Sequence, residues 1–204
     1  MYIHIFPAIW SSIYLLYIRY PIKSYDLCDC ETNKIGYLYA SLSHFNYFHL
    51  CSNILSWYCL CYLFSFNPTI ILLQLFGGIS GIFLHNYKKN NMCIGGSGGL
   101  CAIEIFYGLK EMNNFTSFFI PFIFIPLWIR LPLYQITILN IGLDFIGDYL
   151  KDNIYNYNKI SHKSKWWLKN FNTFRHGTNN ISCWGHFGGL CVGIMAYGIY
   201  RFWK

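Results

Sequence analysis

The sequence predicts an all-α polytopic membrane protein, and three observations carry this prediction. Hydrophobic residues make up 55% of the 204 residues and charged residues only 11%, which is far from the balance of a soluble domain. Aromatic residues reach 21%, and a bilayer accommodates them both in its core and in its interfacial belts. Several apolar segments approach the length of about 20 residues that a helix needs to cross the hydrocarbon core. We therefore expect a single membrane domain over residues 1–204, in contact with the lipid bilayer.

Six segments are predicted to span the membrane as helices, because lipid offers the backbone no hydrogen-bonding partners. The predicted spans cover approximately residues 3–20, 42–66, 69–87, 97–110, 132–149 and 183–203. The first has no basic leader and no small-residue cleavage site, which favours a mature helix over a signal peptide. The second stops at Asn67 and Pro68, and the third ends in the polar stretch KKNN. The sequence selects no particular membrane.

Two further segments are predicted as loops. Between the fourth and fifth spans, FTSFFIPFIFIPLWIRL contains Pro121 and Pro126, which a continuous helix tolerates badly. We interpret it as an apolar loop at the membrane surface, and a seventh span is the alternative. Residues 151–182 are rich in Asn and Lys, which predicts a long polar loop.

Charge and cysteine content exclude two classes of function. Six of the 15 Lys and Arg residues lie in residues 151–175, so the net charge of +7 describes one loop and not a nucleic-acid surface. Trp166 and Trp167 in that loop fit a membrane interface better than a base-stacking platform. Of the nine cysteines, five lie inside apolar runs, where Cys behaves as a small hydrophobe, and no CxxC pair is present. We expect neither a nucleic-acid partner nor a metal site.

Polar side chains inside two predicted spans indicate a functional region, since ionisable and amide groups are costly in lipid. The second span holds His44, His49 and Asn53 in its first half, and the last two are i and i+4 on one helix face. The sixth span holds His186 one turn from its start. Small residues around that histidine let a neighbouring backbone approach closely, and they form a stripe of Gly185, Gly189 and Gly193.

The stretch GGSGG supplies a partner for that contact. Gly95 and Gly96 allow the chain to turn sharply, Ser97 opens the fourth helix, and Gly98 gives this helix a small face. A serine at a helix start also has a structural explanation, because its hydroxyl can cap the first N–H groups. A hydroxyl, a histidine on a glycine-faced helix and a His-Asn pair together favour nucleophilic catalysis instead.

These residues resemble the motifs of the rhomboid intramembrane serine proteases. The three matching motifs fall in the family's order on the second, fourth and sixth predicted spans. They are HxxxxHxxxN at His44, His49 and Asn53, GxSG at Gly95, Gly96, Ser97 and Gly98, and GHxxGxxxG at Gly185, His186, Gly189 and Gly193. The resemblance extends through most of residues 42–203.

The resemblance implies a six-helix rhomboid-like bundle that works with a Ser-His dyad and no acid. Ser97 would attack the scissile carbonyl, and His186 would take its proton and hand it to the leaving amine. Asn53, His49 and the backbone N–H groups of Ser97 and Gly96 would stabilise the oxyanion. The implied substrates are single-pass membrane proteins with locally unstable helices, and no metal or organic cofactor is needed.

The chain departs from the family pattern at Cys101, where the family usually has an aromatic ring against the catalytic histidine. Asp144 matches a frequent Asp of the family, and we expect it to be a structural hydrogen-bonding residue. Glu104 is a functional candidate as an intramembrane acid, with pairing to a buried polar neighbour as the alternative. His4 and His85 are expected to be interfacial or loop residues.

Two other functions stay open at this stage. An inactive rhomboid-like protein would bind membrane clients without cutting them. A transporter or channel would also use intramembrane His, Asn and Glu side chains, but it leaves the serine on a glycine turn unexplained.

Overall fold

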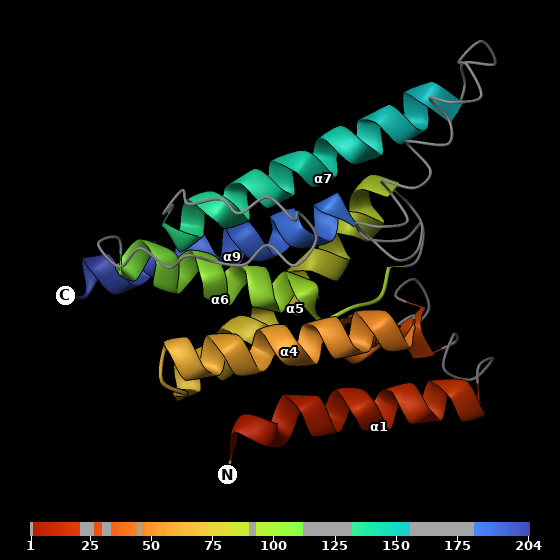
Figure 1. Cartoon of the computed structure of the whole chain (residues 1–204), viewed down its shortest axis with the longest axis horizontal. Coiled ribbons are helices and arrows are strands. Elements are labelled where there is room, and N and C mark those ends of the chain that lie inside the picture. The colour runs from red at the N-terminus through yellow and green to blue at the C-terminus, as the bar shows by residue number, and fades with distance from the viewer. Residues whose placement is uncertain are drawn as a thin grey trace, which may run out of the picture.

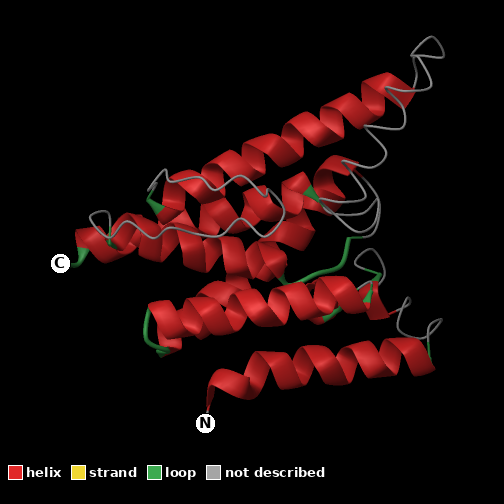
Figure 2. Ribbon diagram, viewed as in Figure 1, coloured by secondary structure: helices red, strands yellow, loops and turns green. Residues whose placement is uncertain are grey.

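The computed structural model describes residues 2–20, 27–29, 34–44, 46–89, 93–111, 132–155 and 182–204. Within these ranges the regular structure is helical and contains no strand (Figure 2), so the all-α prediction is confirmed. The elements are a 3-10 turn η1 (Tyr2–His4) and the helices α1 (Ile5–Arg19), α3 (Gly36–Leu42), α4 (Tyr47–Leu63), α5 (Pro68–Lys89), α6 (Ser97–Lys110), α7 (Leu133–Tyr155) and α9 (Cys183–Phe202).

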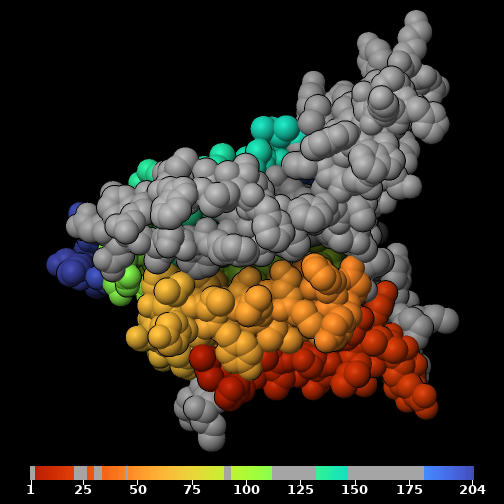
Figure 3. Space-filling model, viewed as in Figure 1, coloured from red at the N-terminus to blue at the C-terminus, as the bar shows by residue number. Residues whose placement is uncertain are grey.

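Helices α5, α6 and α9 form the centre of the bundle, where each packs extensively on the other two. Helix α7 contacts α6 and α9 on one side, and α4 contacts α6 on the other (Figure 1). Helix α1 lies along α4 at the outer edge, where the two share one face of the molecule (Figure 3). The candidate residues of α4, α6 and α9 therefore come from neighbouring helices.

Glycines explain how closely the three central helices approach. A β-carbon at Gly81 of α5 would lie 2.5 Å from the carbonyl oxygen of Gly185 in α9. One at Gly77 of α5 would lie 2.6 Å from the β-carbon of Ala102 in α6. Real β-carbons essentially never come this close to other heavy atoms, so backbone-to-backbone packing here depends on small residues.

The glycines of the stripe predicted on the last span contact two different helices. A β-carbon at Gly189 would overlap the carbonyl oxygen of Gly98, and one at Gly193 would lie 2.7 Å from the carbonyl oxygen of Ala102, so both face α6. Gly185 instead presents its carbonyl to Gly81 of α5. The contact with α5 was not predicted, although its run FGGISG carries the same small-residue spacing.

The second predicted span, residues 42–66, begins earlier than the helix that occupies it, α4, and α3 was not predicted as a helix. Helix α3 ends at Leu42 and α4 begins at Tyr47, because the side chain of Asn46 accepts the backbone N–H of His49 (2.8 Å) and caps α4 there. His44 lies in the connection between α3 and α4 and not inside a helix, which corrects its predicted place.

Two predicted loops meet the described residues only in part. Helix α7 continues to Tyr155, so it takes in the first residues of the segment predicted as a polar loop, 151–182. The rest of that segment up to residue 181 and the proline-broken segment 115–131 lie outside the described residues. The fourth span, by contrast, was predicted with the bounds that α6 has.

Among the described helices, α5 alone is long and apolar enough to cross a membrane by length and composition. Helix α1 and the Leu133–Ile146 part of α7 are shorter apolar helices. Large apolar side chains are nevertheless exposed on the outer surfaces of several helices, among them Leu15, Leu55, Tyr62, Phe76 and Met195. Such surfaces are suited to contact with lipid or with another protein.

Candidate active site

The glycine turn before α6 presents Ser97 at the start of that helix. Gly95 has φ +143°, a conformation that L side chains rarely adopt, and a β-carbon there would lie 2.7 Å from Cε1 of His49. Gly96 is the N-cap residue and has no side chain, so Ser97 is the first helical residue and not the cap. The capping interpretation of Ser97 is therefore not what the structure shows.

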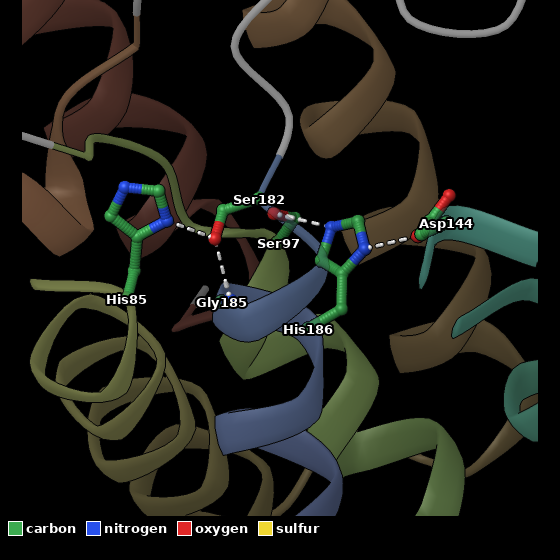
Figure 4. A network of polar contacts seen from close by, with 6 residues as sticks. All are labelled: His85, Ser97, Asp144, Ser182, Gly185 and His186. Atoms are coloured by element: carbon green, nitrogen blue, oxygen red, sulfur yellow. Dashed lines mark hydrogen bonds and ion pairs between the residues drawn. The ribbon is translucent and has the colours of Figure 1, made fainter. Parts of the chain in front are cut away.

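The Ser97 hydroxyl contacts the candidate base. Its Oγ lies 3.0 Å from Nε2 of His186 (Figure 4), which is within the reach that an activated nucleophile requires. His186 is in the first turn of α9, where Ser182 caps the helix by accepting the N–H of Gly185 (2.8 Å). Close packing of α6 on α9 at their glycines brings the two side chains together.

The second ring nitrogen of His186 faces an acid. Nδ1 of His186 lies 2.7 Å from Oδ2 of Asp144 in α7 (Figure 4). Both side chains are sheltered, with 16% of His186 and 7% of Asp144 exposed. From the sequence we expected Asp144 to be a structural hydrogen-bonding residue, and its contact with His186 was not predicted.

The His-Asn cluster of the second motif lies beside the serine. Nδ2 of Asn53 is 2.8 Å from Nε2 of His44 and 3.4 Å from Nε2 of His49, so the amide joins the two histidines. Ser97, His49 and Gly95 line a cavity of about 10 Å³, which is about the space of one water molecule. Asn53 does not line this cavity and reaches the site through His49.

Several residues outside the motifs hold the glycine turn in place. Nε2 of Gln74 in α5 donates to the carbonyl oxygen of Gly96 (2.8 Å), and the N–H of Gly95 donates to the carbonyl of Ala40 (3.0 Å). A β-carbon at Gly96 would lie 2.9 Å from Cζ2 of Trp10 in α1. Gln74 was not predicted as a site residue from the sequence. The one indication was that it is an amide side chain inside an apolar predicted span.

A second Ser-His pair lies beside the first. His85 of α5 pairs with the Ser182 hydroxyl that caps α9, next to Ser97 and His186 in Figure 4. The pair ties α5 to the start of α9. We expected His85 to be an interfacial or loop residue, whereas the structure places it in a helix and in this network.

Two candidates named from the sequence lie deeper in the bundle. Oε2 of Glu104 accepts a hydrogen bond from Oγ1 of Thr137 in α7 (2.8 Å), so Glu104 pairs with a polar neighbour. Cys101 lies one turn after Ser97 in α6. No group of three or more His, Cys, Asp or Glu side chains arranged to hold a metal ion is found among the described residues.

A comparison with protein families identifies the family of the chain. The rhomboid domain family model matches residues 32–204, a region that contains all three motifs. The chain belongs to the rhomboid family, has the rhomboid fold and is an integral membrane protein. Most members of this family are intramembrane serine proteases and some are inactive. The comparison with curated proteins finds no match.

Proposed function

We propose that the chain is an intramembrane serine endopeptidase that cleaves transmembrane helices of single-pass membrane proteins. The observation that carries the proposal is the 3.0 Å contact between Ser97 Oγ and His186 Nε2 at the first residue of α6. An inactive family member has no need of a hydroxyl and an imidazole at this distance. The contact therefore favours a protease over a protein that only binds membrane clients.

The proposed reaction proceeds by acyl transfer. His186 Nε2 takes the hydroxyl proton as Ser97 Oγ bonds to the scissile carbonyl carbon, and a tetrahedral oxyanion forms. The imidazolium then gives its proton to the leaving amine as the peptide C–N bond breaks, which leaves an acyl ester on Ser97. A water molecule deprotonated by His186 attacks this ester and restores the serine.

The oxyanion is proposed to form at the N-terminus of α6. The first N–H groups of a helix have no acceptor within it, and the helix dipole favours negative charge there. The backbone N–H groups of Gly96 and Ser97, with the nearby His49 ring, are the proposed donors. Asn53 is proposed to act with His49, to which its amide is 3.4 Å distant.

We also propose that one domain covers residues 1–204 and passes through the membrane several times. Helices α1, α4, α5, α6, α7 and α9 would be the six spans. The exposed apolar side chains on the outer surfaces of these helices support this arrangement.

The test is cleavage in a reconstituted membrane. The wild-type chain is mixed with labelled single-pass helices that carry a helix-destabilising Gly or Pro near the expected cut. We expect product from the wild type and none from Ser97→Ala or His186→Ala. The control is His85→Ala, which changes the neighbouring Ser-His pair and should keep cleavage.

Two results would contradict the proposal. Product formed by Ser97→Ala would exclude this serine as the nucleophile. Binding of the labelled helices by the wild type, without product from any of them, would support an inactive, client-binding member of the family.

A further inference from the structure

We propose that Asp144 is the positioning residue of the site: its carboxylate fixes the tautomer and the ring orientation that let His186 act as a base toward Ser97. This inference rests on the proposed protease function and adds to it a residue that a Ser-His dyad lacks. Asp144 acts through His186, and it is not itself expected to touch the substrate.

The contact with Asp144 fixes the tautomer of the His186 imidazole. An ionised carboxylate only accepts hydrogen bonds, so Nδ1 of His186, 2.7 Å from Asp144 Oδ2, carries the proton. Neutral imidazole has one N–H, hence Nε2 is then the acceptor, and it faces the Ser97 hydroxyl at 3.0 Å. The other tautomer would point an N–H at the hydroxyl and a lone pair at the carboxylate, and it could not take the serine proton.

The orientation of the His186 imidazole depends on few other contacts. Within the described part of the chain, no aromatic ring stacks on the His186 imidazole, and the residue one turn after Ser97 is the small Cys101. The ring is therefore held by hydrogen bonds at its two nitrogens. A bond to a charged carboxylate is the stronger kind, and with 7% of Asp144 exposed it is largely sheltered from water.

Asp144 also faces the positive charge that forms on His186 during the reaction. When Nε2 takes the serine proton, the ring becomes a cation, and Asp144 is the anion in direct contact with it. The Nδ1 proton stays on the ring throughout, so no further proton acceptor is needed. The carboxylate thus favours the protonated state that the tetrahedral intermediate requires.

The control variant for Asp144 is chosen from the other titratable groups near His186. Glu104 of α6 and His49 of α4 both interact electrostatically with His186. Cys101 interacts electrostatically with Glu104 and Asp144. The hydrogen bond that Glu104 makes is to Thr137 and not to His186. Glu104→Gln therefore removes one nearby carboxylate without touching Nδ1, whereas Asp144→Asn removes the carboxylate that does.

The kinetic test compares wild type, Asp144→Asn, Asp144→Glu and Glu104→Gln in the same vesicles. In proteases with a Ser-His-Asp triad, loss of the acid lowers kcat by about 10⁴-fold. We expect Asp144→Asn to lose about 10²- to 10⁴-fold in kcat with KM changed less than about threefold, as a transition-state effect predicts. Asp144→Glu should recover part of the loss, and Glu104→Gln should stay near wild type. Equal losses in Asp144→Asn and Glu104→Gln, or none in either, would overturn the inference.

A spectroscopic test does not depend on turnover. In protein with ¹⁵N-labelled histidine, the Nδ1 proton shared with a carboxylate should give a downfield resonance. We expect Asp144→Asn and His186→Gln to abolish it, and Ser97→Ala and Glu104→Gln to keep it. Thermal unfolding of each variant shows whether the bundle is intact, and Asp144→Glu serves if the asparagine variant fails to fold. A folded wild type without this resonance would overturn the inference.

The proposed function and the Asp144 inference would be contradicted by different results. The proposed function fails if the wild type cuts nothing or if Ser97→Ala still cuts. The Asp144 inference fails if cleavage requires Ser97 but proceeds unchanged in folded Asp144→Asn.

Discussion

Replacing Gly81 of α5 by alanine tests whether glycine packing sets the geometry of the site. The new β-carbon would lie 2.5 Å from the carbonyl oxygen of Gly185, the residue before His186. An ordinary van der Waals contact begins near 3.4 Å, so α9 must move away by about 0.9 Å. Because the three nearest atoms all belong to the Gly185 backbone, a side-chain rotation cannot relieve the overlap. Overpacking of this kind costs about 1–3 kcal/mol.

The displacement of α9 should change the distance between Ser97 and His186. A displacement near 1 Å between catalytic groups lowers rates by about 10²-fold, and the moving segment carries His186. We expect Gly81→Ala to slow cleavage by one to two orders of magnitude and to lower the midpoint of thermal unfolding. The assay is cleavage of a labelled single-pass helix, with unfolding of the same preparation followed in parallel.

The matched control is Gly198→Ala in α9, where the new β-carbon would have no atom within 4 Å. Both variants gain the same helix propensity of about 1 kcal/mol, so the difference between them isolates the overlap. Full activity and equal stability in Gly81→Ala would refute the reasoning that close backbone contact positions His186.

Three further changes address other parts of the fold. Gln74→Leu removes the bond to the Gly96 carbonyl (2.8 Å), so stability should fall by about 1 kcal/mol and cleavage should slow; unchanged kinetics would contradict a role in holding the turn. Ser182→Ala removes the cap of α9 and should cost about 1 kcal/mol, measured by thermal unfolding; an unchanged midpoint would contradict it. Tyr107→Phe removes the hydrogen bonds between the Tyr107 hydroxyl and the Asn67 amide and should also destabilise by about 1 kcal/mol. Its hydroxyl lies ten residues along α6 from the serine, about 15 Å, so cleavage by folded protein should not change, and a loss of kcat would contradict that separation.

The sequence predicted well where the signal was local. The bounds of the fourth predicted helix agree with those of α6, because a glycine turn precedes Ser97 and the apolar run stops at Lys110. The position of Ser97 next to His186 could be anticipated because small residues on two helices allow close approach, and the motif order matched one family. Local patterns of this kind also fixed α9 to within one residue.

Contacts between distant segments were harder to predict. The pairing of Asp144 with His186 joins α7 to α9, and no periodicity within either segment encodes which acid faces which nitrogen. His85 was expected to be an interfacial or loop residue because it is isolated in the sequence; it lies in α5, and its contact with Ser182 of the α9 cap was not predicted. Helix α3 was missed, and the second span was started at its last residue, Leu42. The asparagine that caps α4 was therefore counted as part of the span.

Covalent labelling shows whether Ser97 is the nucleophile that His186 activates. The reconstituted chain is treated with a fluorophosphonate, which bonds to activated serine hydroxyls, and the adduct is located by mass spectrometry. We expect one adduct on Ser97, absent from His186→Ala and retained in His85→Ala. An adduct on Ser182, which also pairs with a histidine, or an intact chain that takes no label, would contradict it.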